Sequence, residues 1–243
     1  MGGAREAGPC PACGVENAAD HNFCKSCGSP LGLDQDQELG LSFAERMRDR
    51  CLALLKGQPD NPRAHFDLGL AYYHLGQTGN ATRAFERCLQ LEDAYPAAHF
   101  QLALCHYRRG AMAECAALAR RAIELNPSSA PAHFRLAIAL FHQGRLDESA
   151  HAFERTVEVD PEYVIALYHL GLIRERQKSI DAAIQCFEKV VEANPGDASA
   201  HYHLGLCYEH QGLDGLAITE LSKALELDPG DTAAASALQE LQR

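Results

Sequence analysis

The sequence predicts an all-α protein, built as a solenoid of repeated helix–turn–helix units that follows a small cysteine-rich head. Three observations in the 243-residue chain support this prediction. A pattern of aromatic and aliphatic residues returns at a constant spacing, glycine and proline punctuate that pattern at fixed places, and two Cys-x-x-Cys pairs precede it. Internal repeats of this kind indicate an array in which each unit buries its apolar face against its neighbours.

Five segments align without a gap, and each begins 34 residues after the previous one, at residues 65, 99, 133, 167 and 201. The segments are HFDLGLAYYHLG, HFQLALCHYRRG, HFRLAIALFHQG, LYHLGLIRERQK and HYHLGLCYEHQG. The five repeat units are therefore expected at 62–95, 96–129, 130–163, 164–197 and 198–231.

Each unit is expected to contain two helices, of which the aligned segment is the first. Glycine can end a helix in the left-handed conformation, and it occupies position 15 in Gly76, Gly110, Gly144 and Gly212. The second helix has apolar residues three or four apart, for example Ala81, Phe85, Cys88 and Leu89. A helix cannot continue through proline, which stands at position 32 in Pro127, Pro161, Pro195 and Pro229.

The same spacing extends beyond both ends of the repeats. Met47, Cys51 and Leu54 occupy second-helix positions, so residues 42–61 are expected to form a half-repeat, or capping helix, that begins the array. Residues 232–243 begin a sixth unit without a second helix, and we expect a C-terminal capping helix there. Residues 34–41, DQDQELGL, are expected to form an acidic linker.

The repeats resemble those of the tetratricopeptide repeat (TPR) family. In the fourth and fifth units the resemblance rests on Leu170, Gly171, Ala183, Phe187, Pro195, Leu204, Gly205, Tyr208, Gly212, Ala217, Ala224 and Pro229. It implies a right-handed α-solenoid, whose first helices line a concave groove with positions 2, 5, 9 and 12. It also implies that a protein or peptide partner binds in this groove.

The groove residues follow from that alignment. The expected partner-binding residues are Phe66, Leu70, Tyr73, Phe100, Leu104, Tyr107, Phe134, Ile138, Phe141, Tyr168, Leu172, Tyr202 and Leu206. Positions 5 and 9 could equally pack between neighbouring first helices, whereas the aromatic residues at position 12 are harder to explain by packing. Position 13 adds a cationic or histidine edge, formed by His74, Arg108, His142, Arg176 and His210. Such an apolar strip favours an amphipathic or apolar segment as the partner.

The sequence departs from the family pattern in two places, one that bears on the kind of partner and one on the fourth repeat. Some TPR domains bind a C-terminal carboxylate with Lys at position 5 and Asn at positions 6 and 9, but this chain has Phe66, Gln101 and Leu70 at the corresponding places. In the fourth unit, Arg174 stands at the usually aromatic position 11 and Lys178 replaces the glycine. The second departure predicts a longer or less regular turn.

The N-terminal head, residues 1–33, is expected to be a small zinc ribbon. So few residues rarely bury an adequate core without a metal or disulfides. Soft thiolates suit tetrahedral coordination of one structural Zn²⁺, and the expected ligands are Cys10, Cys13, Cys24 and Cys27. Iron, bound as in rubredoxin, is disfavoured because rubredoxin's cysteine pairs lie further apart. A redox dithiol would need a βαβ context, which the sequence lacks.

The sequence offers no candidate catalytic site, and we expect a protein that is not an enzyme. Neither HExxH nor a phosphate-binding glycine loop is present. Four of the twelve histidines stand at position 4 and are expected to pack rather than to share a metal, because they lie on different helices. The remaining cysteines are expected to be reduced and buried, and these are Cys51, Cys88, Cys105, Cys115, Cys186 and Cys207.

The formal net charge of −11 argues against general affinity for nucleic acids or anionic membranes. The chain has no apolar run long enough to span a membrane and no secretory segment at its start, so we expect a cytoplasmic protein. The predicted function is a non-enzymatic scaffold or adaptor that binds a peptide segment. The alternatives are a self-assembling oligomer, or an adaptor that contacts nucleic acid through the ribbon.

Overall fold

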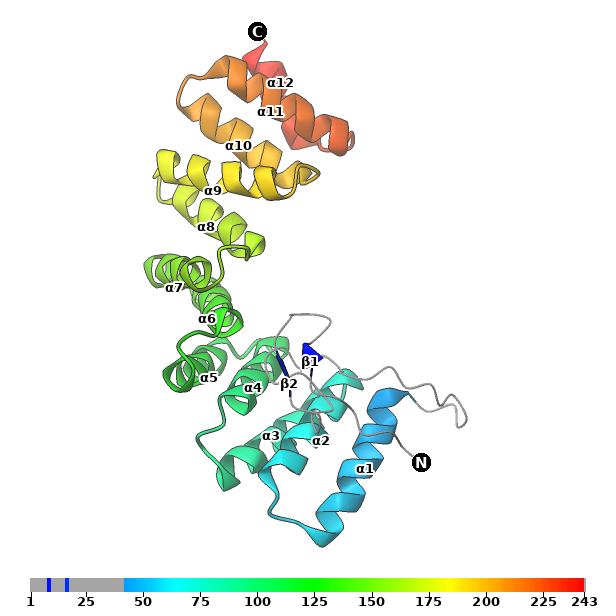
Figure 1. Cartoon of the computed structure of the whole chain (residues 1–243). Helices are drawn as coiled ribbons and strands as arrows, with labels where there is room; N and C mark the ends of the chain where they lie inside the picture. Colours follow the sequence, from blue (N-terminus) through cyan, green and yellow to red (C-terminus); the bar gives the residue numbers. More distant parts are fainter. Residues whose placement is uncertain (1–7, 10–15, 18–41, 243) are drawn as a thin grey trace. The chain divides into compact units, whose positions relative to one another are not determined.

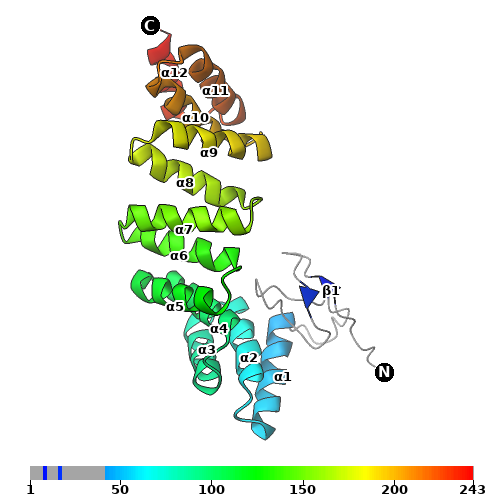
Figure 2. The ribbon, with the colours of Figure 1, turned by 60° about the vertical axis from the view of Figure 1, so that its left-hand side comes forward.

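The computed structural model describes residues 8–9, 16–17 and 42–242, which form two compact units, 1–143 and 144–243. The N-terminal unit contains β1 (Gly8–Pro9), β2 (Glu16–Asn17), α1 (Phe43–Gly57), α2 (Pro62–His74), α3 (Thr78–Leu91), α4 (Pro96–Arg108), α5 (Met112–Leu125) and α6 (Ala130–His142) (Figure 1). The C-terminal unit contains α7 (Leu146–Val159), α8 (Val164–Arg176), α9 (Ile180–Ala193), α10 (Ala198–His210), α11 (Asp214–Leu227) and α12 (Thr232–Leu241) (Figure 2). The predicted helical repeat architecture is confirmed.

The predicted zinc ligands Cys10, Cys13, Cys24 and Cys27 and the predicted linker, residues 34–41, lie outside the described residues. In the N-terminal segment, β1 and β2 pair in antiparallel fashion. Gly8 lies opposite Asn17, and Pro9 lies opposite Glu16.

The turn between the two helices of a repeat has one geometry throughout. In four units the residue at position 15 is a glycine with φ between 71° and 76°. The next backbone N–H closes the turn, as when Gln77 donates to the Tyr72 carbonyl at 2.9 Å. This is the left-handed helix end that the glycine spacing predicts.

The fourth repeat keeps the same turn, so the prediction of a longer or less regular turn was wrong. Lys178 adopts φ 59°, and Ser179 donates to the Arg174 carbonyl at 2.9 Å. The closing hydrogen bonds therefore determine the turn, and lysine is held in a conformation that glycine adopts at lower cost.

Arg174 makes the same contact between repeats as the aromatic residue at position 11 of the fifth repeat. It forms an ion pair with Glu154 of α7, at position 25 of the preceding repeat. In the fifth repeat the residue at the same position is Tyr208, whose hydroxyl donates to Glu188 at 2.9 Å. Glu188 again stands at position 25 of the preceding repeat, so an arginine and a tyrosine make equivalent contacts.

The second helices supply much of the core. Ala81, Phe85 and Cys88 of α3 are fully buried, as their spacing predicts. On α1, Met47 and Cys51 are buried, whereas the side chain of Leu54 is 44% exposed. Leu55 packs against the core instead. The first helix of the array packs on α2, and only a narrow stripe at every fourth residue is covered.

Hydrogen bonds tie a first helix to the preceding repeat, and they do so at both ends in α6 and α10. At its start, the position-4 histidine donates through Nε2 to the carbonyl six residues earlier. Four repeats share this bond: His65 to Pro59, His99 to Asp93, His133 to Pro127 and His201 to Pro195, at 2.8–3.1 Å. At its end, the position-14 glutamine reaches the start of the preceding second helix. Gln143 donates to the Met112 carbonyl at 2.8 Å, and Gln177 donates to Asp147 at 2.7 Å.

In four of the five repeats, the residue at position 8 of the first helix is matched in size to the residue at position 24 of the second. A Cβ added to Gly69 would lie 2.5 Å from the Phe85 ring, and one added to Gly171 would lie 2.8 Å from Phe187. In the second repeat, Ala103 packs in one cluster with Ala119. The first, fourth and fifth repeats thus pair glycine with a large residue, and the second pairs alanine with alanine. The third repeat departs from this matching, because Ala137 and Phe153 occupy the two positions and both are fully buried.

This matching predicts that Gly69→Ala destabilises the protein, although alanine is the better helix former. Phe85 is fully buried and has no room to move, so overpacking should lower the free energy of unfolding by about 1–3 kcal/mol. The control is Gly79→Ala in α3, where an added Cβ meets nothing within 4 Å. That variant should be neutral or more stable by up to about 1 kcal/mol. Denaturant titration checks both, and equal stability of the two variants would contradict the matching.

The strained turn predicts that Lys178→Gly stabilises the protein. Removing the left-handed penalty of a lysine should exceed the added chain entropy of glycine, for a net gain of about 0.5–1 kcal/mol. Lys178→Ala is the matched control, because it removes the charge but keeps the strain. Thermal unfolding followed by circular dichroism compares the two, and a gain in the alanine variant alone would assign the effect to charge instead.

Candidate functional site

The candidate site lies on the first helices of the N-terminal unit, where α2 contacts α4 and α4 contacts α6. We call the side that carries positions 5, 9 and 12 of these helices the first-helix face. Four of the predicted partner-binding residues are buried, with 0–8% of their surface exposed: Phe66, Leu70, Phe100 and Ile138. In the isolated chain these four side chains belong to the core.

The other predicted residues of this unit keep part of their surface exposed, and these are Tyr73, Leu104, Tyr107, Phe134 and Phe141. In the C-terminal unit the predicted residues Tyr168, Leu172, Tyr202 and Leu206 are also half-buried. The three aromatic residues at position 12 of the N-terminal unit thus remain partly accessible on three first helices.

Side chains of the next repeat cover each tyrosine of the first-helix face. The guanidinium carbon of Arg108 on α4 lies 3.8 Å from the ring centroid of Tyr73 on α2. One repeat later, the guanidinium carbon of Arg135 on α6 lies 4.4 Å from the centroid of Tyr107 on α4. The ring of His142 also lies 6.0 Å from Tyr107. The cationic edge expected at position 13 therefore contacts the aromatic residues at position 12.

Sequence reasoning missed Arg135, which stands at position 6. Its Nε is buried and has no hydrogen-bond partner among the residues that the structure describes. Such a donor is costly to bury unless a partner arrives. Position 6 is polar in each of the three repeats, as Asp67, Gln101 and Arg135. Polar residues at one position of a well-packed helix could have identified position 6 as a candidate binding position.

In the C-terminal unit, position 12 carries a carboxylate in place of an aromatic ring. Glu175 at position 12 of α8 accepts a hydrogen bond from Nδ1 of His203 on α10 at 3.0 Å. The His203 ring stacks on Phe187, with the centroids 5.4 Å apart. Position 12 of one repeat thus faces position 6 of the next in both units, but with different chemistry.

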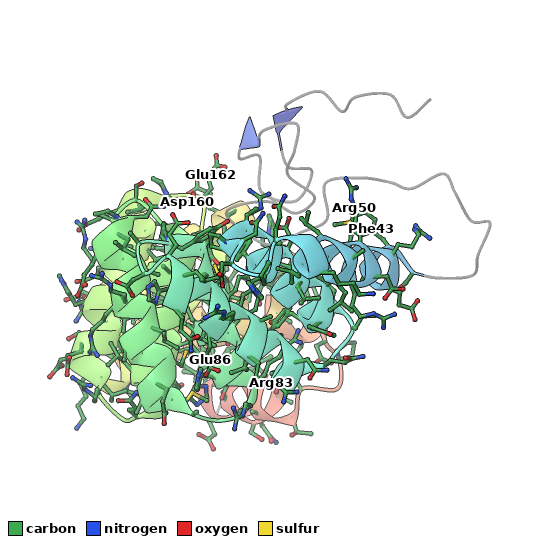
Figure 3. The ribbon with its side chains drawn as sticks, turned by 90° about the horizontal axis from the view of Figure 1, so that it is seen from below. Phe43, Arg50, Arg83, Glu86, Asp160 and Glu162 are labelled. Carbon is green, nitrogen blue, oxygen red and sulfur yellow. The ribbon has the colours of Figure 1, made fainter. Side chains whose placement is uncertain are left out.

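The second helices carry a different surface. Arg83 and Glu86 of α3 are exposed and point into solvent (Figure 3). Arg87 of the same helix forms an ion pair with Asp60 at 2.6 Å. Their charges are of both signs, as on an ordinary solvated helix, and they contrast with the aromatic first-helix face.

Burial shifts the titration of several groups but creates no nucleophile. It raises the pKa of the Tyr73 hydroxyl, an effect that Arg108 opposes. Burial also raises the pKa of Cys51, Cys88 and Cys207 to about 12. All six cysteines in the described part of the chain are buried free thiols, as expected. A thiol with so high a pKa stays protonated at neutral pH and is a poor nucleophile or metal ligand.

The described helices offer no cluster of three metal-binding side chains. The position-4 histidines lie on separate first helices and make the backbone hydrogen bonds given above. Between residues 42 and 242, no helix has both the length and the apolar character needed to cross a membrane.

Fold and face together define a class of helical repeat proteins with a partly exposed aromatic surface on the first helices. A family model of the tetratricopeptide repeat matches residues 50–89, 134–198 and 179–232, more than half of the chain. The protein therefore belongs to the tetratricopeptide repeat family. A model of anaphase-promoting complex, cyclosome, subunit 3, matches residues 74–156. No curated protein matches the sequence.

Several solved structures share the fold. YrrB, described as a TPR protein with an unusual peptide-binding site, is 17% identical with a TM-score of 0.73, over 79% of this chain and 99% of YrrB. MamA is 26% identical with a TM-score of 0.64, over 67% of this chain and 95% of MamA. PilF of Pseudomonas aeruginosa is 18% identical with a TM-score of 0.62, over 82% of this chain and 85% of PilF.

Proposed function

We propose that this protein is a non-enzymatic scaffold that binds an apolar or amphipathic segment of a partner protein on its first-helix face. The observation that carries the proposal is the row of half-buried aromatic side chains, Tyr73, Tyr107 and Phe141, on consecutive first helices. Partly exposed aromatic residues are costly to leave in water and are enriched where proteins bind each other.

Two further features support this proposal. The contacts of Arg108 and Arg135 with the tyrosine rings hold those rings in place, so little side-chain entropy is lost when a partner binds. The family supplies a precedent, because YrrB, which shares the fold, is described as having a peptide-binding site. A cytoplasmic location suits such a scaffold.

The proposal predicts that Tyr73→Ala, Tyr107→Ala and Phe141→Ala, combined in one variant, abolish recovery of the partner. Removing three aromatic surfaces deletes the apolar area on which binding depends. Affinity purification from cells of the source organism, followed by mass spectrometry, measures the loss. Circular dichroism confirms that the variant is folded, because Tyr73 and Tyr107 also pack against the core.

Leu52→Ala with Leu54→Ala is the matched control. Both leucines are exposed on α1, at 40% and 44%, and lie outside the first-helix face. This variant loses apolar surface but should recover the same partners. Equal recovery by the triple variant and the wild type would reject the face as the binding site.

Light scattering tests the alternative that the protein assembles with itself. If the wild type is an oligomer and the triple variant is a monomer, the partner is a second copy of the chain.

We also propose that the N-terminal head holds one structural Zn²⁺ with Cys10, Cys13, Cys24 and Cys27 as ligands. The two Cys-x-x-Cys pairs match the usual ligand spacing of tetrahedral thiolate sites. In the sequence, the antiparallel pair of β1 and β2 stands on either side of the first cysteine pair. A closed site of four thiolates leaves no position for water, so its role is to fold the head.

Metal analysis tests the zinc proposal. The wild-type chain should contain about one zinc per molecule, and Cys10→Ser with Cys13→Ser should lose it, since a half-site binds far more weakly. The control is Cys51→Ser, which changes a buried thiol of α1 and should keep the metal. Full zinc content in the double variant would refute the four-cysteine site.

A further inference from the structure

The first helices of the N-terminal unit are unusually poor in acidic residues. α2, α4 and α6 together hold a single carboxylate, Asp67, in a chain with a net charge of −11. Asp67 is buried and already paired with Arg63 at 3.1 Å. The same helices carry Arg108 and Arg135 and several histidines. This face is therefore cationic, although the protein as a whole is acidic.

Neither arginine of the first-helix face has an ion pair among the residues that the structure describes. Each lies over a tyrosine ring, which attracts a cation through its face but accepts no in-plane hydrogen bond from the guanidinium. A guanidinium has five N–H donors in a planar fork. The donors at the edge of each fork thus remain available to an acceptor from outside the chain.

In the C-terminal unit, the residue at position 6 has a hydrogen-bond acceptor within the chain, at position 12 of the preceding repeat. There the pair between position 12 and the next position 6 is Glu175 and His203, 3.0 Å apart. In the N-terminal unit the equivalent pair is Tyr107 and Arg135. The carboxylate that accepts the hydrogen bond from position 6 in one unit is missing from the other.

We propose that the first-helix face of the N-terminal unit recognises an acidic peptide segment. Aspartate or glutamate side chains of the partner bind Arg108 and Arg135, and its apolar residues lie on Tyr73, Tyr107 and Phe141. Paired donors of a guanidinium match the two oxygens of a carboxylate, which gives charge-assisted hydrogen bonds. This inference rests on the proposed function and names the chemistry of its partner.

A peptide explains the face better than a nucleic acid does. Binding to a phosphate backbone needs a row of lysines and arginines that spans several phosphates. α2, α4 and α6 contain no lysine, and their two tyrosine-bound arginines stand one repeat apart. The aromatic residues between them require apolar side chains next to the carboxylates.

The experiment selects a random peptide library on the full-length chain. The recovered peptides should be enriched in aspartate and glutamate beside aromatic or aliphatic residues. One of these peptides, fluorescently labelled and amidated at its C-terminus, is then titrated by fluorescence anisotropy. Arg108→Gln and Arg135→Gln should each weaken its binding roughly ten- to hundredfold, the usual loss for one charge-assisted contact. Arg135→Lys should weaken binding too, because it keeps the charge but loses the planar fork.

Two matched controls separate local contacts from net charge. Arg109 is adjacent to Arg108 but contacts no ring of the described face, and Arg83 lies exposed on α3. Arg109→Gln and Arg83→Gln should leave binding within about twofold of the wild type, because long-range effects of exposed charges are screened. Circular dichroism confirms that every variant is folded.

Each other outcome overturns the inference in an identifiable way. Peptides without acidic enrichment, or binding insensitive to Arg108→Gln and Arg135→Gln, reject the acidic partner. If such peptides still fail to bind the triple aromatic variant, the proposed function stands. If no recovered peptide depends on the aromatic residues, both proposals fail. Arginine-dependent binding of a single-stranded RNA of mixed sequence, in place of a peptide, also rejects the inference.

Discussion

The placement of α6 depends on hydrogen bonds at its two ends. A buried histidine near the start donates to a carbonyl of the preceding loop, and a glutamine at the end reaches the start of the preceding second helix. These two points fix the position of α6 along its axis. Because the helices are aligned in this way, Arg135 of α6 lies over Tyr107 of α4. The candidate binding surface is thus a consequence of how the repeats are joined.

The face and the core share residues rather than form separate layers. Phe66 at position 5 is covered by Tyr95 of the loop that leads to α4, with ring centroids 4.9 Å apart. Tyr73, two turns further along the same helix, is covered only in part, by an arginine. α2 therefore passes from a packed beginning to an accessible end. The chemistry offered to a partner is concentrated at that end.

The sequence spacing predicted the helices, the turns of the four repeats with glycine and the accessible position-12 residues, because each depends on a period within one chain. It could not divide positions 5 and 9 into buried and exposed members, since their burial depends on the neighbouring repeat. Arg135 escaped notice because its long side chain reaches across to another repeat. Lys178 was misjudged because the hydrogen bonds of the turn outweigh the preference of a single residue. The zinc ligands stay a prediction.

The size matching between the two helices of a repeat restricts how the sequence can change. Glycine lies against phenylalanine in the first repeat and alanine against alanine in the second, while the third repeat holds alanine with phenylalanine. A route from the first of these pairings to the second that begins at Gly69 passes through a steric clash. A route that begins at Phe85 passes through a cavity, which the later alanine partly fills. In the first repeat, where an added Cβ at Gly69 would lie 2.5 Å from the Phe85 ring, the order of two substitutions therefore matters as well as their identity.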